Sequence, residues 1–255
     1  MTGQTNPIGA DCERLGLGRS VVARVIATVM PTQKSEKGYD PLSRRIGVLI
    51  SGRGSNLQSM IDAIAAGRLN ATIAVVVSNR SDAVGLQRAR AAGIDTLCLS
   101  PRDYLDRFAY DQAIVDHLRS RDVRQICLAG FMRLVGAPLL EAFHNRILNI
   151  HPSLLPAFPG VDAQRQAWEH GVGITGATVH LVTAELDNGP IILQSAVPVY
   201  DDDTPESLSA RILVEEHRLY PEAIQIVLDG HWKVEGRRFM RLPAEASATP
   251  LPAGS

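Results

Sequence analysis

An asparagine and a histidine stand on either side of Ile150, in the segment Asn149-Ile150-His151-Pro152. The apolar run Ile147–His151 predicts a short strand, which Pro152 ends because proline cannot continue strand pairing. Side chains alternate between the two faces of a strand, so Asn149 and His151 leave the same face at its C-terminal end. A single histidine at a strand end is more often structural, but an amide and an imidazole together on one face, ahead of a loop with two prolines, favour a functional role.

A second candidate is the loop Ser51–Asn56, which connects an apolar run, Ile46–Ile50, to a stretch with apolar residues at helical spacing. The first N–H groups of a helix have no partner within the helix, and the helix dipole favours an anion there. The two glycines of the loop allow close backbone approach, while Ser55 and Asn56 add side-chain donors or a helix cap. The loop has neither the ending of a nucleotide P-loop nor the third glycine of a dinucleotide fingerprint. These residues alone support anion binding and a plain tight turn about equally.

The chain offers little for metal chemistry. Its seven histidines form no HExxH pattern, and its three cysteines, Cys12, Cys98 and Cys127, are far apart without a CxxC pair. A GxSxG nucleophile elbow is also missing from the sequence. We therefore predict a site without a metal ion.

The elements that must position these residues follow a regular alternation from Arg45 onward. Helices are predicted up to Gly67, over about 83–92 and over about 103–119, between four apolar strands: Ile46–Ile50, Ile73–Val77, Thr96–Leu99 and Gln125–Ala129. Strands that are apolar throughout and alternate with helices are typical of a parallel sheet covered on both faces. We predict an α/β fold, Rossmann-like and doubly wound, with a mostly parallel sheet. Ligands bind such sheets at the C-terminal ends of the strands.

The second half of the chain no longer alternates regularly between strands and helices. Thr178–Val182 and Ile191–Val199 resemble strands of a hairpin, and the segment 185–190 between them reads first as a turn that contains Asp187. A helix is predicted from Thr204, a capping residue followed by proline, to about Tyr220, with a continuation to residue 229 after the break at Pro221. We divide the chain into an N-terminal extension of uncertain order (1–43), one domain (44–241) and a flexible tail (242–255).

Composition narrows the class of function. Hydrophobic residues make up 45% of the chain, charged residues 21%, and the formal net charge is −1. This is the balance of a soluble globular protein without the positive field that nucleic-acid binders carry. We predict small-molecule substrates, no nucleic-acid partner and no membrane partner, since no apolar run reaches the length of a membrane span. Unpaired cysteines and the lack of a convincing signal sequence favour a cytoplasmic location.

Four motifs, in this order and at these distances, resemble the folate-dependent glycinamide ribonucleotide formyltransferases. The resemblance covers about residues 45–240 and rests on the following segments: Ser51-Gly52-Arg53-Gly54-Ser55-Asn56, Ala129-Gly130-Phe131-Met132-Arg133, Asn149-Ile150-His151-Pro152-Ser153-Leu154-Leu155-Pro156 and Leu186-Asp187-Asn188-Gly189-Pro190. The third and fourth mark the wider formyltransferase group, and Gly-Ser-Asn points to the phosphorylated substrate. The resemblance implies the formyltransferase fold and 10-formyltetrahydrofolate as co-substrate.

The resemblance also implies a role for particular residues. The catalytic residues would be Asn149, His151 and Asp187. The phosphate loop would consist of Gly54, Ser55 and Asn56, and Glu216 would hold the substrate amine. The folate carrier would lie against five residues: Arg107, Met132, Arg133, Leu134 and Val135. The chain departs from the family at Asp162, with Gln164 nearby, and at Thr175, where some members have histidine; we expect neither position to be essential.

The implied reaction is attack of the substrate amine on the formyl carbon, with glycinamide ribonucleotide as acceptor and formyl folate as donor. Asn149 and a protonated His151 would donate to the oxyanion, and Asp187 would favour the imidazolium. The chain is expected to be a monomer or a homodimer.

Three other functions fit parts of the sequence. A formyltetrahydrofolate hydrolase would use similar residues with water as acceptor, but the Gly-Ser-Asn loop argues against it. A methionyl-tRNA formyltransferase would normally add a C-terminal nucleic-acid-binding domain. A non-catalytic nucleotide sensor of the same fold would be expected to lose the three polar catalytic residues, and all three are present.

Overall fold

A computed structural model describes residues 44–243 of the chain. The predicted extension (1–43) and residues 244–255 of the predicted tail lie outside the described residues. The strands are β1 (Arg45–Ile50), β2 (Thr72–Ser78), β3 (Thr96–Cys98), β4 (Gln125–Leu128), β5 (Ile147–His151), β6 (Ile174–Leu181), β7 (Ile191–Pro198), β8 (Trp232–Glu235) and β9 (Arg238–Arg241). The helices are α2 (Ser55–Ala65), α3 (Val84–Ala91), the 3₁₀ turn η1 (Pro101–Asp103), α4 (Arg107–Arg119), α5 (Ala137–Ala142), α6 (Ala163–Glu169) and α7 (Pro205–Asp229).

One nine-stranded mixed sheet runs through the described residues, in the order β3-β2-β1-β4-β5-β6-β7-β9-β8. The first five strands in this order, β3 to β5, run parallel to one another. From β1 the chain adds strands on one side of the sheet as far as β3 and then crosses to the other side with β4, so the strand order reverses between β1 and β4. Connections diverge at such a switch point, which leaves a crevice at the C-terminal strand ends. The mostly parallel α/β fold predicted from the sequence is confirmed. The hairpin-like character of the second half is confirmed too, because β5, β6 and β7 pair antiparallel.

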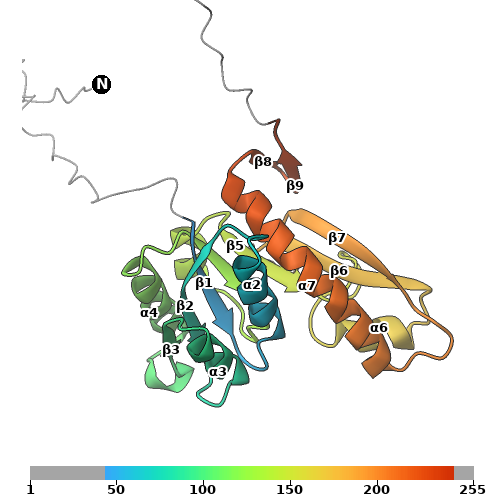
Figure 1. The fold of residues 1–255 in the computed structure, drawn as a ribbon, viewed down its shortest axis with the longest axis horizontal. Coiled ribbons are helices and arrows are strands. Elements are labelled where there is room, and N and C mark those ends of the chain that lie inside the picture. Colours follow the sequence, from blue (N-terminus) through green and yellow to red (C-terminus); the bar gives the residue numbers. More distant parts are fainter. Residues whose placement is uncertain (1–43, 244–255) are drawn as a thin grey trace, which may run out of the picture. The chain divides into compact units, whose positions relative to one another are not determined.

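Helices cover both faces of the sheet (Figure 1). The side chains of β1 show the division: Ile46, Val48 and Ile50 pack into the core under α2, α3 and α7, whereas Leu49 belongs to the core under α4 and α5. This is the alternation expected of a strand buried on both faces. The layered packing holds the C-terminal end of β1 rigidly, and α2 begins there.

Two helix predictions were wrong in detail. The helix expected from about residue 103 begins at Arg107, because Pro101–Asp103 forms a separate 3₁₀ turn and Asp106 caps α4 by accepting the Ala109 N–H at 2.8 Å. The predicted break at Pro221 is absent from α7, which is helical throughout its 25 residues. Pro221 is buried among core residues, so tertiary packing outweighs the lost hydrogen bond.

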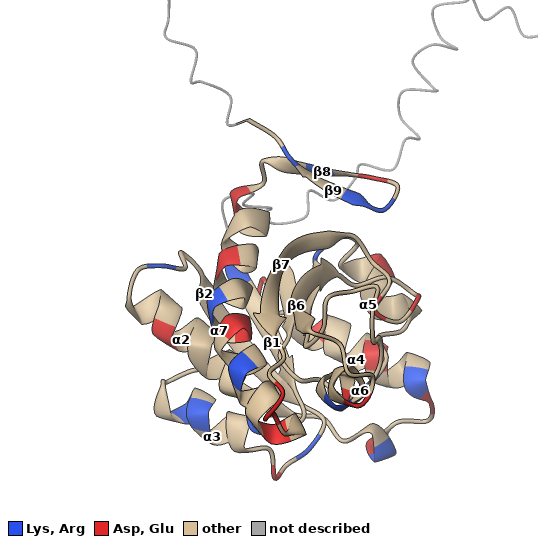
Figure 2. Ribbon diagram, turned by 90° about the vertical axis from the view of Figure 1, so that its right-hand side faces the viewer, with Lys and Arg blue, Asp and Glu red and all other residues tan. Residues whose placement is uncertain are grey.

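The sequence analysis did not predict four short elements. Helices α5 and α6 have six and seven residues, and strands β8 and β9 have four each. Such lengths are too short to show a clear period. Both acidic and basic residues lie along α7 and on the β8–β9 hairpin (Figure 2). Within residues 44–243, no helix is long and apolar enough to cross a membrane.

Candidate active site

Three polar residues from two distant parts of the chain meet at the C-terminal end of β5. Asn149 and His151 lie on β5, and Asp187 lies in the turn between β6 and β7. The antiparallel pairing of β5 with β6 brings that turn back over the strand end, so that His151 Nδ1 lies 3.4 Å from Asp187 Oδ2. The structure therefore brings together the residues that the resemblance implied as catalytic.

Asp187 is held as a buried carboxylate. Its Oδ2 accepts the Gly160 N–H at 2.8 Å, and its backbone has φ of 49°, in the left-handed region that turns use. Burial alone would raise the pKa of Asp187, but the contact with His180, the hydrogen bond from Gly160 and the charge of His151 lower it below its ordinary value. The carboxylate is thus ionised at neutral pH and available to pair with a cation.

His151 is buried, and both of its ring nitrogens face acceptors. Nε2 lies 2.8 Å from Phe158 O and must donate to it, since a carbonyl can only accept. Burial lowers the pKa of His151 below its ordinary value, although Phe158 O and Asp187 act in the opposite direction. Burial thus opposes the imidazolium that the implied mechanism needs, while the two acceptors that face the ring favour it. Donation to a substrate oxygen also requires that Nε2–H exchange its Phe158 partner for that oxygen.

His180 belongs to the same cluster and was missed by the sequence analysis. It lies directly opposite Asn149 in the β5–β6 pair, and its Nε2 lies 3.2 Å from Asn149 Nδ2 and 3.6 Å from Asp187 Oδ1. Its Nδ1 donates to Leu181 O at 2.9 Å, so Nε2 accepts from the asparagine. This contact orients the amide of Asn149. The only indication in the sequence was its place in a predicted strand, which does not reveal the register.

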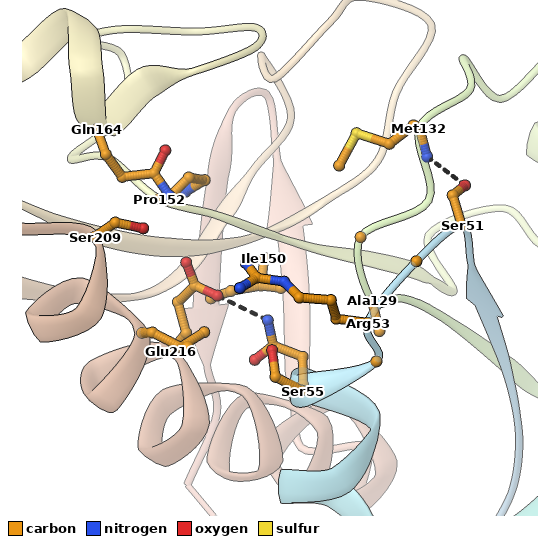
Figure 3. A pocket seen from close by; sticks show the side chains of 15 residues that line it. Ser51, Arg53, Ser55, Ala129, Met132, Ile150, Pro152, Gln164, Ser209 and Glu216 are labelled. Carbon is orange, nitrogen blue, oxygen red and sulfur yellow. Dashed lines mark hydrogen bonds between the residues drawn. The ribbon is translucent and has the colours of Figure 1, made fainter. Parts of the chain in front are cut away.

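A cavity of about 370 Å³ lies between the loop after β1, the end of β5 and α7 (Figure 3). Its lining includes the loop Ser51–Asn56, Ile150, Pro152 and Glu216. Ile150 and Pro152 alternate with Asn149 and His151, so the cavity and the catalytic cluster flank the same strand end. A ligand in the cavity can reach the cluster by passing over the C-terminal end of β5.

The N-terminus of α2 opens into this cavity. Gly54 caps the helix in a left-handed conformation with φ of 69°, and α2 has neither a side-chain cap nor an acidic residue in its first turn. A Cβ on Gly54 would lie 2.6 Å from the Gly85 Cα, so a side chain there would clash with α3. The first N–H groups of α2, beginning at Ser55, are therefore placed as an anion site requires.

Asn56 and Glu216 form a buried pair across the cavity. Asn56 Nδ2 donates to Glu216 Oε2 at 2.7 Å, while Asn56 Oδ1 is buried and has no partner among the described residues. Burial raises the pKa of Glu216, and the Asn56 hydrogen bond and the charge of Arg53 partly offset this. Because the amide is engaged and its free atom is an acceptor, the Asn56 side chain suits a hydroxyl or amine donor better than a phosphate.

Two of the residues implied for folate binding, Arg107 and Arg133, lie near Asp111, which the sequence analysis did not single out. This carboxylate is 2% exposed; its Oδ2 accepts the Gly136 N–H at 2.8 Å and lies 3.8 Å from Arg107 Nε. The guanidinium of Arg133 lies 5.2 Å from the centre of the Tyr110 ring.

Helix α4 thus fixes the segment 132–136 from one side. From the other side, Ser51 Oγ accepts the Met132 N–H at 2.8 Å (Figure 3). Met132 and Leu134 are 72% and 59% exposed, so the segment presents apolar side chains at the surface. It connects the residues that the resemblance implied for folate binding to the loop of the cavity.

The two departures from the family lie in different environments. Asp162 is exposed at the start of α6, with φ of 54°, and Gln164 after it lines the cavity. Thr175 is buried on β6, and its Oγ1 lacks a partner within the described part of the chain. Neither Asp162 nor Thr175 is a hydrogen-bond partner of His151 or Asp187.

Residues 44–243 contain no group of three or more His, Cys, Asp or Glu placed to hold a metal ion.

Comparison with known proteins identifies the family. Residues 44–224 match the family model described as formyl transferase. The chain is 44% identical over 189 residues to phosphoribosylglycinamide formyltransferase of Escherichia coli K12, covering 74% of this chain and 89% of that protein. A solved structure of glycinamide ribonucleotide transformylase 1 from Symbiobacterium toebii is 56% identical, covers 82% of this chain and 99% of its own, and superposes with a TM-score of 0.78.

A third relative is much longer. The trifunctional purine biosynthetic protein adenosine-3 of Bos taurus is 43% identical over 78% of this chain, which spans only 20% of that protein. A formyltetrahydrofolate deformylase from Pseudomonas syringae, 24% identical with a TM-score of 0.72, shares the fold alone. By its matched domain and its identity over nearly the full length of a bacterial relative, the chain belongs to the formyl transferase family, among the phosphoribosylglycinamide formyltransferases.

Proposed function

We propose that this chain transfers the formyl group of 10-formyltetrahydrofolate to the amine of glycinamide ribonucleotide, giving formylglycinamide ribonucleotide and tetrahydrofolate in purine biosynthesis. The observation that carries the proposal is the 44% identity over 89% of a named phosphoribosylglycinamide formyltransferase. It is supported by an open helix N-terminus in a cavity that flanks the Asn149–His151–Asp187 cluster. A phosphorylated amine in the cavity would have its reactive end at the cluster.

The proposed mechanism assigns each residue of the cluster one task. The amine attacks the formyl carbon and forms a new C–N bond, and the carbonyl oxygen gains negative charge. Asn149 and His151 donate hydrogen bonds to this oxygen, and each such donor typically contributes about a hundred- to a thousand-fold in rate. The old C–N bond then breaks, and the proton lost by the amine reaches the departing folate nitrogen, with Asp187 favouring the charged imidazole on the way.

The substrates divide between the two sides of β5. Gly54, Ser55 and Asn56 with Glu216 face the ribonucleotide, and Arg107 with the segment Met132–Val135 faces the folate. Phosphate is bound by the first N–H groups of α2, and Asn56 and Glu216 receive hydroxyl or amine donors of the same ligand. The reaction moves a carbon between two nitrogens without redox change, so we propose that no metal takes part. Prolonged treatment with a strong chelator should accordingly leave turnover unchanged.

Mixing the protein with 10-formyltetrahydrofolate, with and without glycinamide ribonucleotide, tests the proposal directly. Release of tetrahydrofolate should depend on the acceptor and should match formation of the formylated ribonucleotide. Equal release of tetrahydrofolate without the acceptor would show that the protein is a hydrolase and not a transferase. The cytoplasmic location and the monomeric or homodimeric state stay predictions.

A further inference from the structure

The cavity beside β5 has an unusual balance of charge. Among the described residues that line it, Glu216 is the one carboxylate and Arg53 is the one Lys or Arg side chain. Arg53 lies between the two glycines of the loop Ser51–Asn56 and has no role in the assignments made above. A phosphate dianion that entered this cavity would meet a buried acid and a single full positive charge.

The backbone around Arg53 is fixed by α3. Gly52 O accepts the Gly85 N–H at 3.0 Å, and Arg53 O accepts Arg88 Nε at 3.0 Å. These contacts fix the backbone from which the Arg53 side chain extends, while the side chain itself is exposed at the mouth of the cavity. Figure 3 shows its side chain reaching from the loop toward the Glu216 carboxylate.

The Arg53 guanidinium lies near Glu216 but is not hydrogen-bonded to it. Its charge acts on Glu216, yet it forms no hydrogen bond within residues 44–243. All its donors are consequently available to a ligand. A planar guanidinium matches the oxygens of a phosphate and can bind two of them at once.

The helix N-terminus alone does not balance the expected ligand. A helix dipole supplies roughly half a positive charge, whereas a phosphate monoester carries up to about two negative charges near neutral pH. An ionised Glu216 would add repulsion at short range. A cation placed between the phosphate and the acid removes that repulsion, and Arg53 is in position to do so.

We propose that Arg53 pairs with the phosphate of the acceptor and makes the enzyme select phosphorylated over unphosphorylated acceptors. The proposal rests on the proposed function, because it takes glycinamide ribonucleotide as the ligand of the cavity. It deepens that function by assigning the phosphate charge to a side chain outside the Gly-Ser-Asn motif. The phosphate takes no part in the making or breaking of bonds, so loss of its contact with Arg53 affects binding and leaves the chemical step alone.

The test compares Arg53→Gln and Arg53→Lys with the wild type on two acceptors, glycinamide ribonucleotide and its unphosphorylated riboside. For Arg53→Gln we expect the KM for the ribonucleotide to rise about ten- to a hundred-fold, as for a lost charge-assisted hydrogen bond, with kcat little changed. The kcat/KM for the riboside should stay within about three-fold of the wild-type value, because the riboside has no phosphate for Arg53 to bind. Arg53→Lys should recover part of the loss, since it restores the charge without the two-pronged geometry.

Arg90→Gln is the matched control, because it removes the same charge from an exposed α3 residue that does not line the cavity. It should leave the preference for the phosphorylated acceptor unchanged. An unchanged preference in Arg53→Gln, or equal losses on both acceptors, would overturn the proposal.

A second measurement separates this proposal from the proposed function. Ribose 5-phosphate and ribose are titrated into each protein without folate, and binding is followed by NMR. Arg53→Gln should lose the advantage of the phosphorylated sugar, and Arg90→Gln should keep it. If the wild type released folate without an acceptor, the proposed function would fail, and this titration alone would decide the role of Arg53.

Discussion

At the scale of single residues, His151 is the group on which the proposed chemistry depends most. We expect His151→Ala to lower kcat by at least about a hundred-fold with little change in either KM, because the lost hydrogen bond forms mainly in the transition state. His231→Ala, at an exposed histidine between α7 and β8, is the control and should retain full turnover. Steady-state kinetics on protein with a normal thermal unfolding transition decides the matter. Near-normal turnover in the variant would remove His151 from the mechanism.

Asp187 has a separate, electrostatic role that a second substitution isolates. Burial lowers the pKa of His151 and the Asp187 carboxylate raises it, so removal of that charge should lower the His151 pKa further. Asp187→Asn keeps the turn, since asparagine tolerates the φ of 49° found there. We expect a lower His151 pKa in an NMR titration and a strong loss of turnover. A pKa that stays the same or rises would show that Asp187 is not the charge partner of His151.

At the scale of elements, the segment 132–136 depends on its contact with α4. A Cβ on Gly136 would lie 2.4 Å from Asp111 Oδ2 and 3.3 Å from Arg107 Nε. Gly136→Ala should therefore displace the carboxylate and loosen the folate side of the site. We expect the KM for 10-formyltetrahydrofolate to rise by about ten-fold while the KM for the ribonucleotide stays the same.

Gly173→Ala serves as the control for this element, because a Cβ at Gly173 meets no atom within 4 Å. It should behave as the wild type toward both substrates. Equal increases in both KM values for Gly136→Ala would show that the substitution disturbs the whole site. An unchanged KM for the folate would show that Asp111 does not position the segment.

At the scale of the whole molecule, the buried Tyr220 ties α7 to the centre of the sheet. Its hydroxyl lies 2.9 Å from Leu128 O on β4 and 3.0 Å from Leu148 O on β5, the two strands that lead to the site. Tyr220→Phe should lower the free energy of unfolding by about 1–2 kcal/mol, because buried carbonyls lose a donor. Urea denaturation measures the change. Tyr200→Phe, at an exposed tyrosine, should change it by less than about 0.5 kcal/mol, and equal losses would refute this account of Tyr220.

The sequence by itself determined the local elements and the same-face placement of Asn149 and His151. Apolar runs of a few residues and their spacing reveal strands and helices because burial follows periods of 2 and 3.6 residues. The loop Ser51–Asn56 could also be placed at the start of a helix, since glycine, serine and asparagine mark such a boundary. These features depend on neighbours in the chain, and a local pattern is enough to predict them.

Tertiary structure decided which distant residues meet. The contact of Asp187 with His151 and the position of His180 follow from the register of β5 with β6, which a short apolar pattern leaves open. Helix α7 passes through Pro221 because its buried face packs on the sheet, against the local preference of proline. Asp111 beneath Gly136 and Arg53 opposite Glu216 are likewise pairs that only the packed layers create. Such contacts join segments far apart in the chain, and their free energy comes from burial and charge that no local period encodes.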